Sequence, residues 1–194
     1  MYKRINECYA KYEPNRWNNN MNFRQSHNCY AYFLNDQSQQ LADIYKREDN
    51  KDRHIINPQP GHYCGMTKFV NYKETTCDNL IKRVICDNPN IKVVKANSSL
   101  DFDCDENYYK GALFANEGSS YHFLRQDENG LWSHKDGGGK ATNLDDDGNL
   151  ITDPKFMKTK YKTFCSYFCV PKNGYKKTNF ARNRYRDNQF WYKN

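Results

Sequence analysis

The sequence has few apolar residues and no long apolar run. Hydrophobic residues make up 37% of the 194 positions, which is low for a globular chain. No stretch of roughly 18 apolar residues occurs, which argues against a membrane-spanning helix. The opening letters MYKRINECYAKYEPNRW also lack the apolar centre of a secretory signal peptide. These absences predict an intracellular protein, either cytoplasmic or packaged in a virus particle.

The eight cysteines lack the Cys-x2-Cys spacing that marks many structural zinc sites. In a chain without a secretion signal, reduced thiols are the usual state of cysteine. We therefore expect buried thiols and no metal site, and no other motif predicts a cofactor. If FCSYFCV forms a strand, Cys165, Tyr167 and Cys169 share one of its faces.

An acidic stretch, NLDDDGNL, has part of the pattern of a calcium-binding loop. Asp145, Asp147 and Asn149 alternate as calcium ligands do, but position 156, where the bidentate Glu of such a loop would stand, is Phe156. Asp147-Gly148 is a strong turn signal. The stretch is therefore interpreted as a hairpin turn without a metal.

Positive charge is concentrated at one end of the sequence. Residues 172–194 contain seven basic residues and one acidic residue, so they hold six of the seven net positive charges. We predict a polar lead-in at 1–26, a domain at 27–171 and a basic, aromatic tail at 172–194. In the tail, the candidate contact residues are Arg182, Arg184, Arg186 and Trp191. This composition favours docking on a partner protein; nucleic acid and packing on the chain's own domain are the alternatives.

Periodicity predicts helices first and strands afterwards. Tyr30, Phe33 and Leu34 have the spacing of a buried helix face, and Asn28 is a suitable N-cap ahead of it. A second helical pattern ends at Asn88-Pro89. Short aromatic or branched segments then follow: IKVVKA, YYKGALFA, YHFLRQ, LWSHK and YKTFCSYFCVP. The order predicts an α+β fold in which helices pack on one face of an antiparallel meander.

Three residues suggest nucleophilic chemistry. Cys29 falls in the first turn of the predicted helix, where the helix dipole and free backbone N–H groups favour a thiolate and can form an oxyanion hole. His122 and His134 flank the DENG turn of one hairpin and can face each other across it. Such a pair suits a general base and the residue that orients it. The alternative is that Cys29 is an inert buried thiol.

The segments NCYAYFL, YHFLRQ and WSHK resemble the motifs of NlpC-type cysteine peptidases, which are papain-like amidases and endopeptidases. The resemblance implies a papain-like fold with Cys29 as nucleophile, His122 as base and His134 as orienting residue. Gln25 and Asn28 are then candidates for oxyanion support. The Cys29-to-His122 spacing is longer than in the minimal family, which implies an insertion near 35–66. Most of residues 28–170 is also similar to a little-characterised family of bacteria and large DNA viruses.

On this basis we predict a cysteine hydrolase that cleaves a peptide or cell-wall amide bond, with the peptide or amide as its partner. In the competing hypothesis the chain is a virion-associated structural protein of minor-capsid type. It would use the same fold with an idle site and dock through its basic tail. Fold alone does not decide between these hypotheses.

Overall fold

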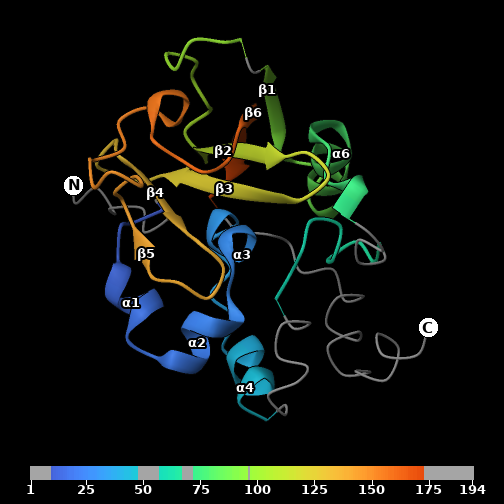
Figure 1. The fold of residues 1–194 in the computed structure, drawn as a ribbon, viewed down its shortest axis with the longest axis vertical. Helices are drawn as coiled ribbons and strands as arrows, with labels where there is room; N and C mark the ends of the chain where they lie inside the picture. Colours follow the sequence, from blue (N-terminus) through green and yellow to red (C-terminus); the bar gives the residue numbers. More distant parts are fainter. Residues whose placement is uncertain (1–9, 48–56, 67–71, 96, 173–194) are drawn as a thin grey trace, which may run out of the picture.

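The computed structural model describes residues 10–47, 57–66, 72–95 and 97–172, and it shows an α+β architecture (Figure 1). The α+β class and the antiparallel sheet predicted from the sequence are thereby confirmed. Helical segments come mostly before the sheet. Their bounds are α1 Pro14–Asn18, α2 Met21–Ser26, α3 Cys29–Phe33, α4 Gln39–Arg47, η1 Tyr72–Glu74, α6 Cys77–Asp87 and η2 Pro154–Phe156.

The six strands form one antiparallel sheet in the order β1-β6-β2-β3-β4-β5. Their bounds are β1 Lys92–Lys95, β2 Tyr108–Asn116, β3 Ser120–Gln126, β4 Trp132–Lys135, β5 Ala141–Thr142 and β6 Thr163–Pro171. The expected simple meander is wrong in one respect, because the last strand lies between the first and the second. No described helix is long and apolar enough to cross a bilayer.

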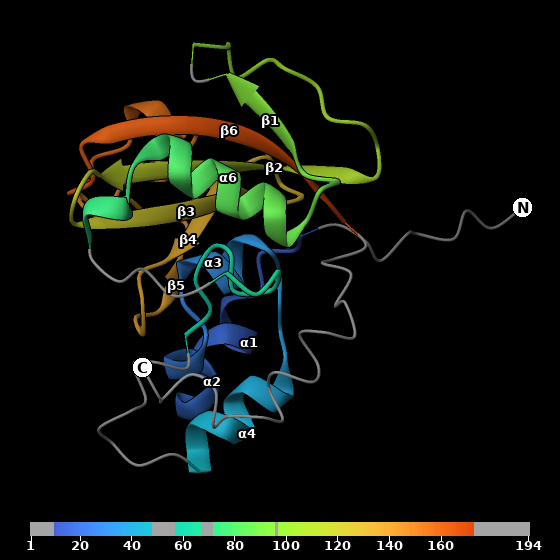
Figure 2. The same cartoon turned by 90° about the vertical axis from the view of Figure 1, so that its right-hand side faces the viewer.

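Side chains on the two faces of the sheet build two separate cores. On one face, α3 and α6 pack against the strands, and α6 runs along the sheet in Figure 2. Phe33, Leu80 and Phe168 are central to this cluster and are fully buried. On the other face, Trp132 and Tyr167 pack with residues of the long connections, such as Ile151. The alternation of side chains along each strand produces this two-faced burial.

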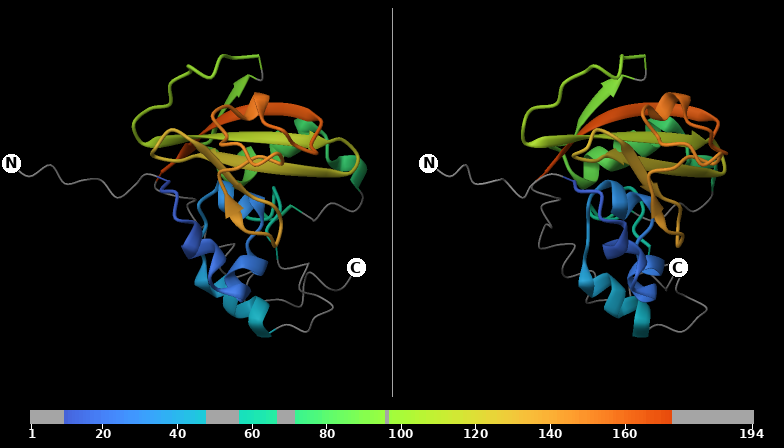
Figure 3. Two further views of the ribbon diagram at one scale, coloured as in Figure 1. Left: turned by 60° about the vertical axis from the view of Figure 1, so that its left-hand side comes forward. Right: turned by 90° about the vertical axis from the view of Figure 1, so that its left-hand side faces the viewer.

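Residues 14–26, assigned from the sequence to a polar lead-in, form α1 and α2 and join the folded domain (Figure 3). Trp17 is fully buried, and its ring lies 4.8 Å from that of Tyr32 and 5.6 Å from that of Phe23. Asn20 caps α2 by accepting a hydrogen bond from the backbone of Phe23. These aromatic contacts make α1 and α2 part of the folded domain.

A β-bulge changes the face to which one strand cysteine points. The register of β6 against β2 shifts between Leu113 and Phe114, which leaves Cys165 without a cross-strand partner. Cys165 packs in the helix-side core, whereas Tyr167 belongs to the opposite core. The prediction that Cys165, Tyr167 and Cys169 share a face is therefore wrong, because the bulge interrupts the alternation.

Six of the eight cysteines form disulfides: Cys64–Cys86, Cys77–Cys165 and Cys104–Cys169. The expectation of reduced thiols is therefore wrong. Cys29 is the free thiol of the described part of the chain, and Cys8 lies outside it. Reduced thiols were predicted because no signal peptide is visible, and a single sequence does not show which cysteines lie close together in space.

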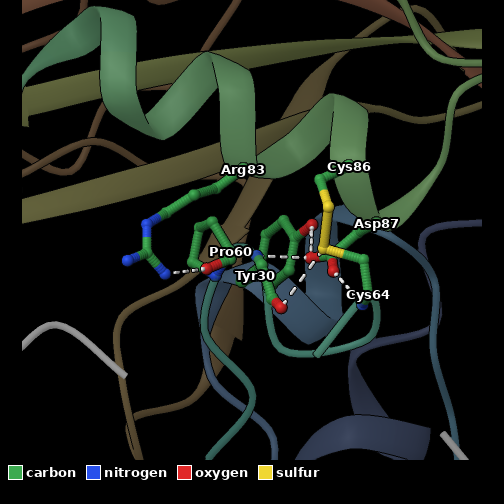
Figure 4. The surroundings of a disulfide bond; sticks show 7 residues. Tyr30, Pro60, Cys64, Arg83, Cys86 and Asp87 are labelled. Atoms are coloured by element: carbon green, nitrogen blue, oxygen red, sulfur yellow. Dashed lines mark hydrogen bonds between the residues drawn. A yellow bond between two sulfur atoms is a disulfide. The ribbon is translucent and has the colours of Figure 1, made fainter. Parts of the chain in front are cut away.

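The Cys64–Cys86 bridge lies beside a buried carboxylate (Figure 4). Asp87 accepts hydrogen bonds from the Tyr30 hydroxyl at 2.6 Å, the Gly61 backbone at 2.7 Å and the Cys64 backbone at 2.8 Å. The disulfide and these bonds join residues 57–66 to the last turn of α6. Gly61 has a φ of 87°, a left-handed conformation that favours glycine.

Replacing Asp87 with Asn is expected to change how stability depends on pH. Burial raises the pKa of the Asp87 carboxyl to about 6, although Tyr30 and the backbone donors lower it in part. A carboxyl group whose pKa is raised by folding stabilises the fold below about pH 4. That contribution is lost as the pH rises through about 6. The free-energy difference between wild type and Asp87→Asn should therefore shift by about 3 kcal/mol between pH 4 and pH 7.5, measured by urea denaturation. A difference independent of pH would contradict the assignment.

Candidate functional site

The start of α3 is shaped by the side chain of Asn28. Its Oδ1 accepts hydrogen bonds from the backbones of Tyr30 and Ala31, each at 3.1 Å, and its Nδ2 donates to the carbonyl of Pro58 at 2.6 Å. The predicted N-cap is thus confirmed. Because Asn28 occupies two first-turn N–H groups, those groups are not free to form an oxyanion hole.

Cys29 follows this cap and is buried, with 6% of its surface exposed. It belongs to the core between α3 and the sheet, as does Phe123 of β3. Burial raises the pKa of the Cys29 thiol to about 12, and the nearby Phe123 backbone and Lys135 ammonium lower it only in part. The helix dipole of a five-residue helix does not offset this desolvation, so the thiol stays protonated at physiological pH.

His122 and His134 contact each other directly. His122 Nε2 lies 2.8 Å from His134 Nδ1, and His134 Nε2 lies 2.9 Å from the carbonyl oxygen of Leu144. In the ladder, His134 is opposite Leu124, so the two histidines are diagonal neighbours on one face. The His122 ring also stacks on Tyr161, with centroids 4.8 Å apart.

The Leu144 carbonyl sets one hydrogen-bond direction in the histidine pair. A carbonyl only accepts, so His134 donates from Nε2. With a neutral His134 ring, its Nδ1 accepts and His122 donates from Nε2. His122 Nδ1 is left as a buried lone pair without a hydrogen-bond partner in the described chain. Burial, together with the neighbouring His134, lowers the pKa of His122 to about 3. The His122 ring is therefore neutral at physiological pH.

The alternation along β3 separates the histidines from the cysteine. Phe123 points into the helix-side core with Cys29, whereas His122, its neighbour in sequence, stacks on Tyr161 of the opposite core. Within the described residues, no hydrogen bond joins the Cys29 thiol to either histidine. The structure therefore brings His122 and His134 together but does not connect Cys29 to them.

The remaining predicted site residues do not converge on this pair. Gln25 lies in α2, where its side chain packs against Gly138 and reaches Met21 Sδ at 3.9 Å. Arg182, Arg184, Arg186 and Trp191 lie outside the described residues. No group of three or more potential metal ligands occurs in the described ranges.

Sequence reasoning missed two buried cations on the hairpin. Lys135 is fully buried, and its ammonium donates to the carbonyls of Arg24, His27 and Gly137. Burial lowers the pKa of Lys135 to about 7. Two of these carbonyls belong to the C-terminal end of α2, where a cation is favoured. The available signal was their position: Arg125 and Lys135 stand in YHFLRQ and LWSHK, two segments predicted to form strands.

Arg125 is the second of these cations and has no exposed surface. Its guanidinium donates to Asp127 Oδ1 at 3.1 Å and Asn35 Oδ1 at 2.7 Å. It also donates to the carbonyls of Tyr32 at 3.3 Å and Lys11 at 2.9 Å, and its carbon lies 4.0 Å from the centroid of the Tyr32 ring. One side chain thus ties β3, α3 and the segment before α1 together.

Alkylation should test the state of Cys29. We expect the folded protein to leave Cys29 unmodified by iodoacetamide at pH 8, because the thiol is buried and protonated. Unfolding in urea without a reductant should expose it. Peptide mass spectrometry measures the modification at each cysteine, and rapid labelling of Cys29 in the native protein would contradict the burial.

These features define a disulfide-linked α+β domain with a buried polar cluster. No known family model matches the chain, and no solved structure matches it. Among curated proteins, the chain is similar to "Insoluble matrix shell protein 1" of Ruditapes philippinarum. The two are 28% identical over 149 residues, which cover 76% of this chain and 80% of that protein.

The comparison and the disulfides correct three predictions. A cysteine hydrolase is not supported: the similar protein is a shell matrix protein, six cysteines are cross-linked, and Cys29 is a protonated thiol. The prediction of a virion-associated protein is likewise wrong, since the chain is similar to a shell matrix protein. A cytoplasmic location is wrong as well, because the similar protein is a shell matrix protein and disulfides are rare in the reducing cytosol.

Proposed function

We propose that this chain is a non-catalytic structural component of an extracellular protein matrix. The observation that carries the proposal is the similarity to the shell matrix protein, which runs over 80% of that protein rather than over one short motif. The three disulfides support it, because secreted structural proteins use such cross-links where no cell repairs or refolds them.

In this proposal, the resemblance to papain-like proteins concerns the fold of the chain and not an enzymatic activity. A helix that begins at Cys29 and packs on an antiparallel sheet agrees with that layout. In the matrix role, Cys29, His122 and His134 are buried polar parts of the core. The histidine pair links β3, β4 and the Leu144 carbonyl by hydrogen bonds. The matrix role requires neither a substrate nor nucleic acid as a partner of the basic tail.

Fractionation of the producing tissue tests the proposal. An antibody against the chain should detect it in the insoluble extracellular fraction, and alkylation before reduction should leave Cys64, Cys86, Cys104 and Cys169 unmodified. Recovery in the cytosol with these cysteines modified would overturn the proposal.

A matched pair of variants, secreted from cultured cells, separates structure from thiol chemistry. Cys29→Ala should be secreted and enter the insoluble fraction as wild type does, because its thiol takes no part in cross-linking. The double variant Cys104→Ala/Cys169→Ala should be retained in the cells, because it lacks a native cross-link. Loss of assembly on removal of the Cys29 thiol alone would argue against a purely structural role for that residue.

A further inference from the structure

A small hollow lies at the end of the sheet where the described chain stops. Its volume is about 240 Å³, and Lys172, the last described residue, is part of its wall. Asp103, Cys104 and Tyr108 line one side, and Asp127 and Glu128 line the other. Pockets for small molecules usually measure roughly 300–1,000 Å³. This hollow suits one or two large side chains rather than a free ligand.

Two carboxylates at the hollow have no cationic partner among the described residues. Asp103 and Glu128 are exposed, and neither forms an ion pair or a side-chain hydrogen bond in the described structure. The other acids nearby are occupied: Asp105 pairs with Lys92, and Asp127 pairs with Arg125.

Two lysines also line the hollow, but their amines are directed to backbone oxygens. Lys110 donates to the carbonyl of Leu100 at 2.9 Å, and Lys172 donates to the carbonyl of Glu106. Segment 97–107, which forms this side of the hollow, contains four acidic residues and no basic one. The rim of the hollow formed by segment 97–107 is therefore negatively charged and can accept further cationic side chains.

The most basic part of the sequence begins at this rim. Segment 173–194 contains six basic residues, one acidic residue and six aromatic residues. Its first residue follows Lys172, whose backbone N–H donates to Asn107 at 2.7 Å and fixes the exit point beside segment 97–107. Aromatic side chains gain burial against Tyr108 and the Cys104–Cys169 bridge, and the basic ones gain partners in Asp103 and Glu128.

We propose that this hollow is the docking site for segment 173–194 of the same chain. A covalent tether of a few residues gives the segment an effective concentration in the millimolar range at its own rim. A second copy would need that concentration in solution to compete. The inference concerns a surface of the monomer, so it stands or falls independently of the matrix function.

Zero-length cross-linking of the full-length protein tests this docking. A carbodiimide joins carboxylates to lysine amines in direct contact, and an equal mixture of ¹⁴N- and ¹⁵N-labelled protein at micromolar concentration distinguishes links within a chain from links between chains. We expect Asp103 and Glu128 to link to Lys176, Lys177 or Lys193 within one chain. Mixed-label peptides would replace the proposal by exchange between copies, and no link above that of exposed Asp147 would overturn it.

Charge reversal makes the test specific. Asp103→Lys with Glu128→Lys removes the linkable carboxylates, so docking is followed by the protease protection of segment 173–194, which should fall at least threefold. Adding Arg182→Glu, Arg184→Glu and Arg186→Glu should restore part of that protection. Asp147→Lys is the matched control and should have no effect. Equal protection in all four proteins would overturn the proposal, and retained disulfides in each would show that the domain is folded.

Discussion

Replacing Cys77 and Cys165 together with alanine is expected to lower the free energy of unfolding by about 4.5 kcal/mol. The bridge joins residues 88 positions apart, so its loss greatly increases the conformational freedom of the unfolded chain. It also removes the covalent link between α6 and β6. Urea denaturation under non-oxidising, non-reducing conditions measures the change against wild type.

The Cys64–Cys86 bridge supplies the matched comparison. It joins residues only 22 positions apart, so the corresponding double alanine variant should lose about 3 kcal/mol. The ranking depends on loop length, since each variant removes two sulfurs and one bond. If the short-loop variant proved the less stable of the two, unfolded-state entropy would not be the main contribution of these bridges.

Replacing Arg125 with methionine is expected to cost about 3–5 kcal/mol, because one partner of a fully buried ion pair is removed. Methionine keeps much of the side-chain length but leaves Asp127 as a buried carboxylate without its cation. It also leaves the carbonyls of Tyr32 and Lys11 without their donor. The midpoint of urea unfolding measures the loss.

Two further variants separate the charge from the packing. Arg125→Met with Asp127→Leu removes both charges and should recover part of the lost stability. Arg16→Met breaks the exposed pair with Glu13, whose side chains are 61% and 49% exposed, and should change stability by less than about 1 kcal/mol. An Arg125→Met effect as small as that of Arg16→Met would mean that the buried network contributes little.

Strand positions were predictable because they depend on local pattern. The segments YHFLRQ and LWSHK became β3 and β4, and Asn28 became the cap of α3, as spacing and residue type indicated. α1 was not predicted, because its one buried aromatic, Trp17, gives no period and becomes significant only when Tyr32 is placed beside it. Long-range pairing, including the position of β6, has no signal in a single sequence.

The hairpin of β3 and β4, which carries His122 and His134, shows which part of a site a single sequence does not predict. The proximity of His122 and His134 followed from the turn between them, but the face of the sheet to which they point did not. Phe123 and Lys135, each next to a histidine in sequence, face the helices, and this places the histidines on the other side. A site that needs a residue from outside the hairpin depends on this choice of face, which tertiary packing determines.

The position of β6 between β1 and β2 has a consequence for biosynthesis. β1 and β2 are each bonded to β6, so before residues 163–171 emerge from the ribosome these two strands have no neighbour between them. Two of the three disulfides also end on β6, at Cys165 and Cys169. The sheet is therefore completed late, after most of the domain has been synthesised. Until then the nascent chain exposes strand edges and thiols, which need protection from aggregation and mispairing.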